Sequence, residues 1–153
     1  MLDIDGVVAD VRHRLHHVAG RPKDWPAFFA GTAADPPLSC GTRLARELAA
    51  AHDIVWLTGR PEHLRATTAD WLAANRLPAG RLQMRSEGDF RPAPEFKLAV
   101  LIELAAGREI GVVVDDDPAV VAAVGAAGLP TRLADWVPYS PTLGAAQHRE
   151  GRT

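Results

Sequence analysis

The sequence predicts an α/β protein: a doubly wound, Rossmann-like parallel sheet flanked by helices, with a small insert after its first strand. Strand-like apolar runs alternate with helix-length segments along the chain, which is the pattern of βαβ units. Residues 110–114 are continuously apolar, as expected of a central strand that is covered on both faces. Right-handed crossovers place the carboxyl ends of parallel strands at one edge of the sheet, so we expect the functional site there.

Length and composition indicate one globular domain. The chain has 153 residues, 47% hydrophobic and 24% charged, and this is long enough to bury a core without cross-links. The net charge of −2 gives no basic surface for nonspecific binding of duplex nucleic acid. Cys40 is the only cysteine, which excludes a disulfide framework and a cysteine zinc site. No signal peptide or membrane span is visible, so we expect a cytoplasmic protein without a membrane partner.

The first residues predict a strand that ends in two acids. Asp3 and Asp5 alternate with apolar residues, so both carboxylates lie on one face of the strand. Gly6 follows at once and permits a sharp turn. Two carboxylates at the carboxyl end of a strand suit a ligand site, although the stretch alone would equally suit an edge strand ending in a polar turn.

Residues 10–38 form an irregular insert interrupted by prolines, in which only a short helix over residues 25–30 is predicted. Such an insert could be a flap over the site, or a surface excursion packed by its own aromatic side chains. Its histidines, His13, His16 and His17, could bind a metal, but no carboxylate stands at a recognised ligand spacing from them.

The later elements are assigned from helical spacing of apolar residues and from clusters of β-branched and aromatic residues. They are a helix over residues 42–51, a strand over 53–58, a helix over 61–75, a strand over 81–85, a helix over 93–106, a strand over 110–114, a helix over 118–126 and a last strand over 129–133. Gly59 and Arg60 are expected to end their strand, with Pro61 at the first position of the next helix. The chain is therefore a single domain over residues 1–146, followed by a flexible tail over 147–153.

Polar residues gather at the predicted carboxyl ends of strands and at the starts of helices. Besides the first acid pair, they are Thr58, Lys97, Asp115 and Asp116. The next residue, Asp117, precedes a proline and is explained as a helix N-cap. Lys97 is one of only two lysines and lies in the first turn of a helix, where the dipole disfavours a cation by up to about 1 kcal/mol. That position is favourable if carboxylates face it.

The four acids would repel one another strongly if the fold brings them together. Each close pair costs on the order of 4 kcal/mol at an effective dielectric constant of about 20. One lysine cannot offset this repulsion, whereas a divalent cation can, and all-oxygen ligation suits Mg²⁺. We therefore predict a Mg²⁺ site at the tips of the first and fourth strands, built by Asp3, Asp5, Asp115 and Asp116.

These parts suit hydrolysis of a phosphate monoester. A carboxylate can attack phosphorus to form an aspartyl phosphate, and the reaction also needs charge neutralisation and a general acid. Asp3 suits the nucleophile and Asp5 the acid and base. The Lys97 ammonium and the Thr58 hydroxyl suit the phosphate oxygens.

The motifs Asp3-Ile-Asp-Gly-Val-Val, Leu57-Thr-Gly-Arg60, Lys97 and Val-Val-Val-Asp115-Asp116 together resemble the haloacid-dehalogenase-like (HAD) superfamily over most of the chain. The resemblance implies that Asp3 is the nucleophile and Asp5 the acid and base. It also implies Mg²⁺ on the Asp3 carboxylate, the Asp5 backbone carbonyl and Asp115, with Asp116 in support. The second acid favours the phosphatases of the superfamily over the dehalogenases, which lack it.

A narrower resemblance is carried by Trp56-Leu-Thr-Gly-Arg60 and Met84-Arg-Ser-Glu-Gly-Asp-Phe-Arg91. These stretches are similar to the phosphatase domain of polynucleotide kinase-phosphatases, which removes 3′-phosphates from nucleic-acid ends. The resemblance implies contacts with phosphate or nucleotide from Gly59, Arg60, Arg85 and Arg91. A guanidinium fork suits phosphate, although arginines in an arginine-rich chain could also be solvated or paired.

Two departures from the family pattern bear on the substrate. Only Met1 and Leu2 precede Asp3, so the natural start could lie upstream, or the first strand could be short. The chain has no G-x-x-x-x-G-K-[ST] phosphate loop and hence no kinase domain, so its substrate could differ from that of the two-domain enzymes.

Several functions stay open on the sequence alone. The insert is too small for a full cap, and an open site would suit a nucleic-acid end. A small phosphorylated metabolite or nucleotide would fit if an oligomer partner covered the site. A non-catalytic phospho-binding module is the other alternative. A phospho-acceptor switch is disfavoured, because there the acceptor aspartate follows the acid pair in the chain.

Overall fold

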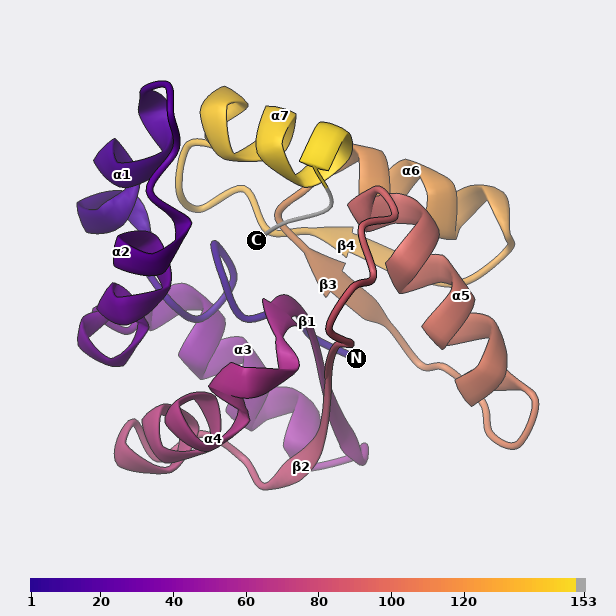
Figure 1. Ribbon diagram of the computed structural model, residues 1–153. Helices are drawn as coiled ribbons and strands as arrows, with labels where there is room; N and C mark the ends of the chain where they lie inside the picture. Colours follow the sequence, from indigo (N-terminus) through magenta and orange to yellow (C-terminus); the bar gives the residue numbers. More distant parts are fainter. Residues whose placement is uncertain (151–153) are drawn as a thin grey trace.

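The computed structural model describes the backbone of residues 1–150 and the side chains of residues 1–146. Its strands are β1 (Ile54–Pro61), β2 (Gly80–Arg85), β3 (Val113–Asp115) and β4 (Thr131–Leu133). β1 pairs with β2, and β3 with β4, in both cases in parallel. The N-terminus lies between the two pairs, in the middle of the sheet (Figure 1). The predicted mixed α/β class with parallel strands is confirmed.

The N-terminal segment joins the two strand pairs into one sheet. On one side Leu2 N–H donates to the Val55 carbonyl and Leu57 N–H donates to the Leu2 carbonyl, both at 2.9 Å. On the other side Asp3 N–H donates to the Val114 carbonyl at 2.9 Å. Leu2 thus forms a parallel bridge with each neighbouring strand. The predicted first strand is this short central segment, which carries Asp3 and Asp5 to the carboxyl edge.

Helices cover both faces of the sheet because successive strand side chains point to opposite faces. On one face the core joins Leu2, Ile4, Trp56 and Val114 to α3 (Ser39–Ala49) and α4 (Arg65–Ala74). On the other face it joins Leu57 and Val113 to α5 (Ala93–Ala105) and α6 (Pro118–Ala126). The two helix pairs lie on opposite sides of the strands in Figure 1. No helix in the described chain is long and apolar enough to cross a bilayer.

The insert folds into short helical pieces whose two ends are tied together. The pieces are η1 (Arg12–Arg14), α1 (His16–Ala19), α2 (Trp25–Ala30) and η2 (Gly31–Ala34). At the ends of the insert, Asp10 N–H donates to the Pro36 carbonyl and Leu38 N–H donates to the Val8 carbonyl, both at 2.8 Å. The predicted helix over 25–30 is confirmed as α2; the Asp24 carboxylate caps it by accepting from Ala27 N–H at 2.9 Å.

A C-terminal helix that the sequence did not predict packs against this insert. α7 (Pro141–Glu150) places Leu143 and Ala146 in a core shared with Val18 and Phe28, and it lies beside α1 in Figure 1. The tail was predicted over residues 147–153. The backbone of α7 covers 147–150, whereas residues 151–153 and the side chains of 147–150 lie outside the described residues.

Several element boundaries differ from the predicted ones, and those of β1, the second of the predicted strands, differ most. β1 does not end at Gly59 but runs through Arg60 to Pro61, with a register shift against β2 after Leu57. Pro61 therefore ends a strand, and the prediction that it opens a helix was wrong: η3 (Glu62–Leu64) and α4 follow it. An irregularity in the ladder lets the strand bend and continue past the glycine. This bend decides where Arg60 points.

The other boundaries shift by a few residues. β3 begins at Val113 rather than at residue 110, and the Met1 amino group donates to the Val112 carbonyl just before it at 2.7 Å. β4 begins at Thr131 rather than at residue 129. α3 begins three residues before its predicted start, at Ser39.

Candidate active site

Three carboxylates meet at the carboxyl edge of the sheet. Asp3 comes from the central segment, Asp115 ends β3, and Asp116 follows it. One oxygen from each of the three lies within 4.8 Å of the others. Gly6 closes the turn beside them at a φ of +74°, and a Cβ at this position would lie 2.1 Å from Asp116 Oδ2. Only glycine therefore lets the turn approach the cluster so closely.

Lys97 lies between two of these carboxylates. Its Nζ is 2.6 Å from Asp115 Oδ2 and 2.8 Å from Asp3 Oδ2. The first two turns of α5 bring Lys97 to this edge, and its side chain is buried. The carboxylates opposite it supply the negative charge that its unfavourable position near a helix N-terminus requires.

The cluster holds more negative charge than one lysine can balance. The pKa of Asp3 is raised to about 7: burial is the main cause, the charges of Asp115 and Asp5 add to it, and the charge of Lys97 opposes them. Burial is also the main cause that raises the pKa of Asp115 and of Asp116. The Lys97 pKa is lowered by burial but raised on balance by Asp115 and Asp3. A further positive charge, either a proton or a cation, is therefore favourable here.

Asp3 keeps one carboxylate oxygen free for a ligand. Its Oδ1 is buried and accepts no hydrogen bond from the described residues. An unpartnered buried carboxylate oxygen is costly, so it indicates a ligand. All three donors are carboxylates, which is the oxygen set that Mg²⁺ prefers. The residues present therefore fit a Mg²⁺ ion.

The carboxylate of Asp5 lies apart from this group and faces two arginines. Its Oδ1 accepts from Arg60 Nε at 3.0 Å, from Arg60 Nη2 at 2.5 Å and from Arg14 Nη2 at 3.2 Å. Burial raises the Asp5 pKa, but the charges of Arg60 and Arg14 outweigh burial and hold the pKa below its usual range. The two arginines thus favour the anionic form of Asp5, whereas burial favours the neutral form of Asp3.

Two residues of the insert, Arg14 and Asp35, complete a buried ion network that the sequence did not reveal. Arg14 donates from Nε to Asp35 Oδ1 at 2.8 Å and from Nη2 to Asp35 Oδ2 at 2.9 Å. Arg60 Nη2 donates to the same Asp35 Oδ2 at 2.7 Å. The Arg14 guanidinium also lies over the Phe28 ring, 4.1 Å from its centroid. The insert thus supplies charged groups to the site.

The predicted substrate-binding residues fall in different places. Thr58 is buried, and its hydroxyl accepts from Arg60 N–H at 3.2 Å. Arg60 joins the network described above, and its Nη1 is buried without a hydrogen-bond partner among the described residues. Gly59 and Arg85 line a separate pocket of about 110 Å³. Arg91 is largely exposed and pairs with Asp89 at 2.6 Å.

The histidines of the insert do not form a metal site in the structure. His13 Nε2 lies 2.8 Å from Asp35 Oδ1, and the rings of His16 and His17 lie 3.9 Å apart. Over the side chains that the structure describes, the only group of three possible metal ligands is that of Asp3, Asp115 and Asp116.

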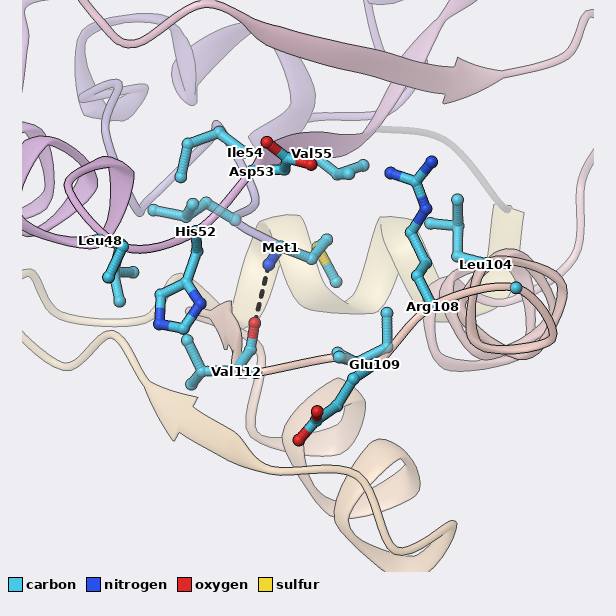
Figure 2. A pocket seen from close by; sticks show the side chains of 15 residues that line it. Met1, Leu48, His52, Asp53, Ile54, Val55, Leu104, Arg108, Glu109 and Val112 are labelled. Carbon is cyan, nitrogen blue, oxygen red and sulfur yellow. Dashed lines mark hydrogen bonds between the residues drawn. The ribbon is translucent and has the colours of Figure 1, made fainter.

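A second cavity lies at the opposite, amino edge of the sheet. It has a volume of about 410 Å³, and its lining includes Met1, His52, Val55 and Val112. Figure 2 shows Met1 between the start of β1 and Val112, with its hydrogen bond to the Val112 carbonyl. The carboxylate cluster lies at the other ends of the same strands, so this cavity is separate from the candidate active site.

Comparisons with known proteins give a family match and similar folds. A family model described as the polynucleotide kinase PNKP phosphatase domain matches residues 1–133. A chain in the "Structure of Pnkp1/Rnl/Hen1 complex" aligns with a TM-score of 0.72 at 19% identity, covering 90% of this chain and 45% of that one. A chain in the "Structure of the Pnkp1/Rnl/Hen1 RNA repair complex" aligns with a TM-score of 0.71 at 20% identity, covering 92% and 42%.

The chain thus spans less than half the length of the chains it resembles in structure. The comparison with curated proteins gives no match. The family match covers most of the sequence, including every acid of the cluster and Lys97. The chain therefore belongs to the family of polynucleotide kinase PNKP phosphatase domains, within the HAD-like phosphatases.

Proposed function

We propose that this chain is a Mg²⁺-dependent phosphatase that hydrolyses a phosphate monoester, at a nucleic-acid 3′ end, through an aspartyl-phosphate intermediate. The observation that carries the proposal is the buried, unpartnered Oδ1 of Asp3 beside Lys97 and the acids of β3. A nucleophile needs a lone pair that is not tied up in a hydrogen bond, and nearby positive charge to receive a phosphate dianion. The family match supports phosphatase activity.

Asp3 is the nucleophile in this proposal. Its free carboxylate oxygen forms a bond to phosphorus while the bond from phosphorus to the leaving oxygen breaks. Lys97 holds the other Asp3 oxygen at 2.8 Å, which orients the carboxylate. The Thr58 hydroxyl and the unpartnered Nη1 of Arg60 are donors for phosphate oxygens.

Asp5 is the acid and base, and its pKa must change during the cycle. In the structure the charges of Arg60 and Arg14 lower its pKa and favour its anionic form. If Arg60 turns toward a bound phosphate, Asp5 loses its closest positive partner and its pKa rises. It can then give a proton to the leaving oxygen and later accept one from the water that hydrolyses the aspartyl phosphate.

Asp3, Asp115 and Asp116 would hold the Mg²⁺ ion together with the Asp5 backbone carbonyl. When bound, the ion would neutralise the charge of the carboxylates and of the phosphate oxygens. The three carboxylates and Lys97 already lie together at this edge of the sheet, where the ion would bind.

The insert over residues 10–38 acts in this proposal as a small flap beside the site and not as a full cap. A site bordered only by short helical pieces leaves room for a long substrate such as a nucleic-acid end. One of the structural neighbours is, by its title, a chain of an RNA repair complex, which supports the same substrate class. Hydrolysis of a small phosphorylated metabolite or nucleotide is the second candidate, and non-catalytic binding of a phosphorylated ligand is the third.

The test measures phosphate release from a 3′-phosphorylated oligonucleotide and from a generic aryl phosphate, in Mg²⁺ and in EDTA. We expect release from both substrates in Mg²⁺, with a higher kcat/KM for the oligonucleotide, and loss of release in EDTA. Release from the aryl phosphate alone would keep the mechanism and favour a metabolite as substrate. A folded protein that binds both compounds and releases phosphate from neither would support the binding module.

Mg²⁺ should raise the unfolding temperature, and more so at pH 8 than at pH 6. The folded-state pKa of Asp3 is raised to about 7, so below this pH a proton occupies the carboxylate and competes with the ion. For the same reason the metal-free protein should lose stability as the pH rises from about 4 to about 7, because the folded state binds more protons than the unfolded state there. Thermal denaturation with and without Mg²⁺ measures both effects. An equal shift at both pH values would contradict the assigned ligands.

A further inference from the structure

We propose that the pocket of about 110 Å³ beside Gly59 binds the nucleobase of the nucleotide that carries the phosphate to be removed. The proposal rests on the phosphatase function proposed above. Gly59 lines the pocket and stands in the chain between Thr58 and Arg60, the two donors proposed for the phosphate oxygens. Its volume is well below the roughly 300–1,000 Å³ of pockets for drug-sized ligands, so it suits one small ring system.

Aromatic rings from two separate elements line the pocket. Phe29, at the end of α2 in the insert, stacks on Trp25 with ring centroids 5.7 Å apart and meets the edge of the His63 ring at 6.1 Å. Phe90, in the loop after β2, also lines the pocket and is 58% exposed. Any of the nucleobases can stack on such a ring, because every base has a π-face.

The lining also includes one buried polar side chain with donors that no described residue accepts, Arg85. Its side chain is buried, yet its Nε and Nη2 donate no hydrogen bond to any described residue. The rest of the guanidinium is fixed: Nη1 donates to the Asp89 and Arg91 carbonyls at 3.3 Å and 2.9 Å, and the group lies over the Phe96 ring at 4.3 Å. Two adjacent unpartnered donors on a planar fork match the neighbouring acceptors on the edge of a base.

The experiment compares a 3′-phosphorylated dinucleotide with the same compound lacking its terminal base. Each is assayed with the wild-type chain, Phe90→Ala, Phe90→Tyr and Ile102→Ala. We expect the wild type to prefer the base-bearing substrate in kcat/KM, and this preference to fall about tenfold in Phe90→Ala, mainly through KM. Phe90→Tyr keeps a ring and should restore the preference. Ile102→Ala is the control, because Ile102 is an apolar residue that is 59% exposed on α5. The preference for the base-bearing substrate should be unchanged in this variant.

Two results would overturn the subsite: a wild type that does not distinguish the two substrates, or a Phe90→Ala effect of equal size on both. The second result would mean that Phe90 contributes to hydrolysis in a way that does not depend on the base. If the wild type hydrolyses neither compound, the phosphatase function fails, and calorimetric binding of the same two compounds decides the subsite. Tighter binding of the base-bearing compound, weakened in Phe90→Ala, would uphold it; equal binding would overturn it.

Discussion

Replacement of Asp3 by Asn should lower kcat by at least about 10⁴-fold, the scale seen when an enzyme loses a covalent nucleophile. The amide has nearly the same shape as the carboxylate, but its oxygen is a far weaker nucleophile and carries no charge for a cation. The fold should persist, because the change removes a buried carboxylate whose pKa is raised to about 7 by burial and by neighbouring acids. Phosphate release in Mg²⁺ measures the effect, and thermal denaturation checks the fold.

Asp70→Asn is the matched control for this change. Asp70 is an exposed acid on α4, so the same chemical substitution there should leave turnover and unfolding temperature unchanged. Near wild-type turnover in Asp3→Asn would eliminate the nucleophile assignment. A large fall in unfolding temperature would instead show that Asp3 is needed for the fold. The turnover of Asp3→Asn would then have to be compared with that of another variant whose unfolding temperature is lowered equally.

Replacement of Asp35 by Asn should destabilise the protein by about 3–5 kcal/mol, as expected when one partner of a buried ion pair is removed. Arg14 and Arg60 both donate to the Asp35 carboxylate, at 2.8–2.9 Å and 2.7 Å, and all three side chains are buried. A neutral amide would leave Asp5 as the remaining carboxylate that pairs with these two cations. The unfolding temperature should fall by about 10 °C for a domain of this size.

Asp10→Asn tests whether burial causes this effect. Asp10 pairs with Arg12 at 2.6 Å, but the Arg12 side chain is 55% exposed, and exposed ion pairs contribute little to stability. We therefore expect almost no change in the unfolding temperature of Asp10→Asn. Equal shifts for Asp10→Asn and Asp35→Asn would contradict the view that the insert is held to the site by buried charge.

The insert shows why part of the site could not be predicted. Arg14 and Asp35 lie near the two ends of a segment with little periodic pattern, and their contacts with Asp5 and Arg60 join residues 9 and 25 positions apart. Local spacing carries no information on such pairs. α7 was missed for a similar reason: its few apolar residues favour a helix only once the insert offers a surface to pack against.

Local signals did determine much of the rest. Proline at the first position and an Asp N-cap delimit α6, and the same residue types begin α2. At Pro61 the local signal led to a wrong prediction, and the failure has a physical cause. Its position favoured a helix start, but pairing with Arg85 of β2 keeps it in the strand. A tertiary hydrogen-bonded ladder overrode the local preference.

The sequence by itself determined the α/β class and the family, and it grouped four acids and one lysine at one edge, of which the structure clusters three acids with the lysine. It could do so because each acid stands at the end of a strand, and parallel strands end at one edge. The catalytic roles of Asp3 and Asp5 stay predictions for the assays above. Only the tertiary structure decided that Asp3 and Asp5 have different environments, one facing Lys97 and acids and the other facing two arginines. That difference depends on side chains brought from distant segments, whose burial and charge set each pKa.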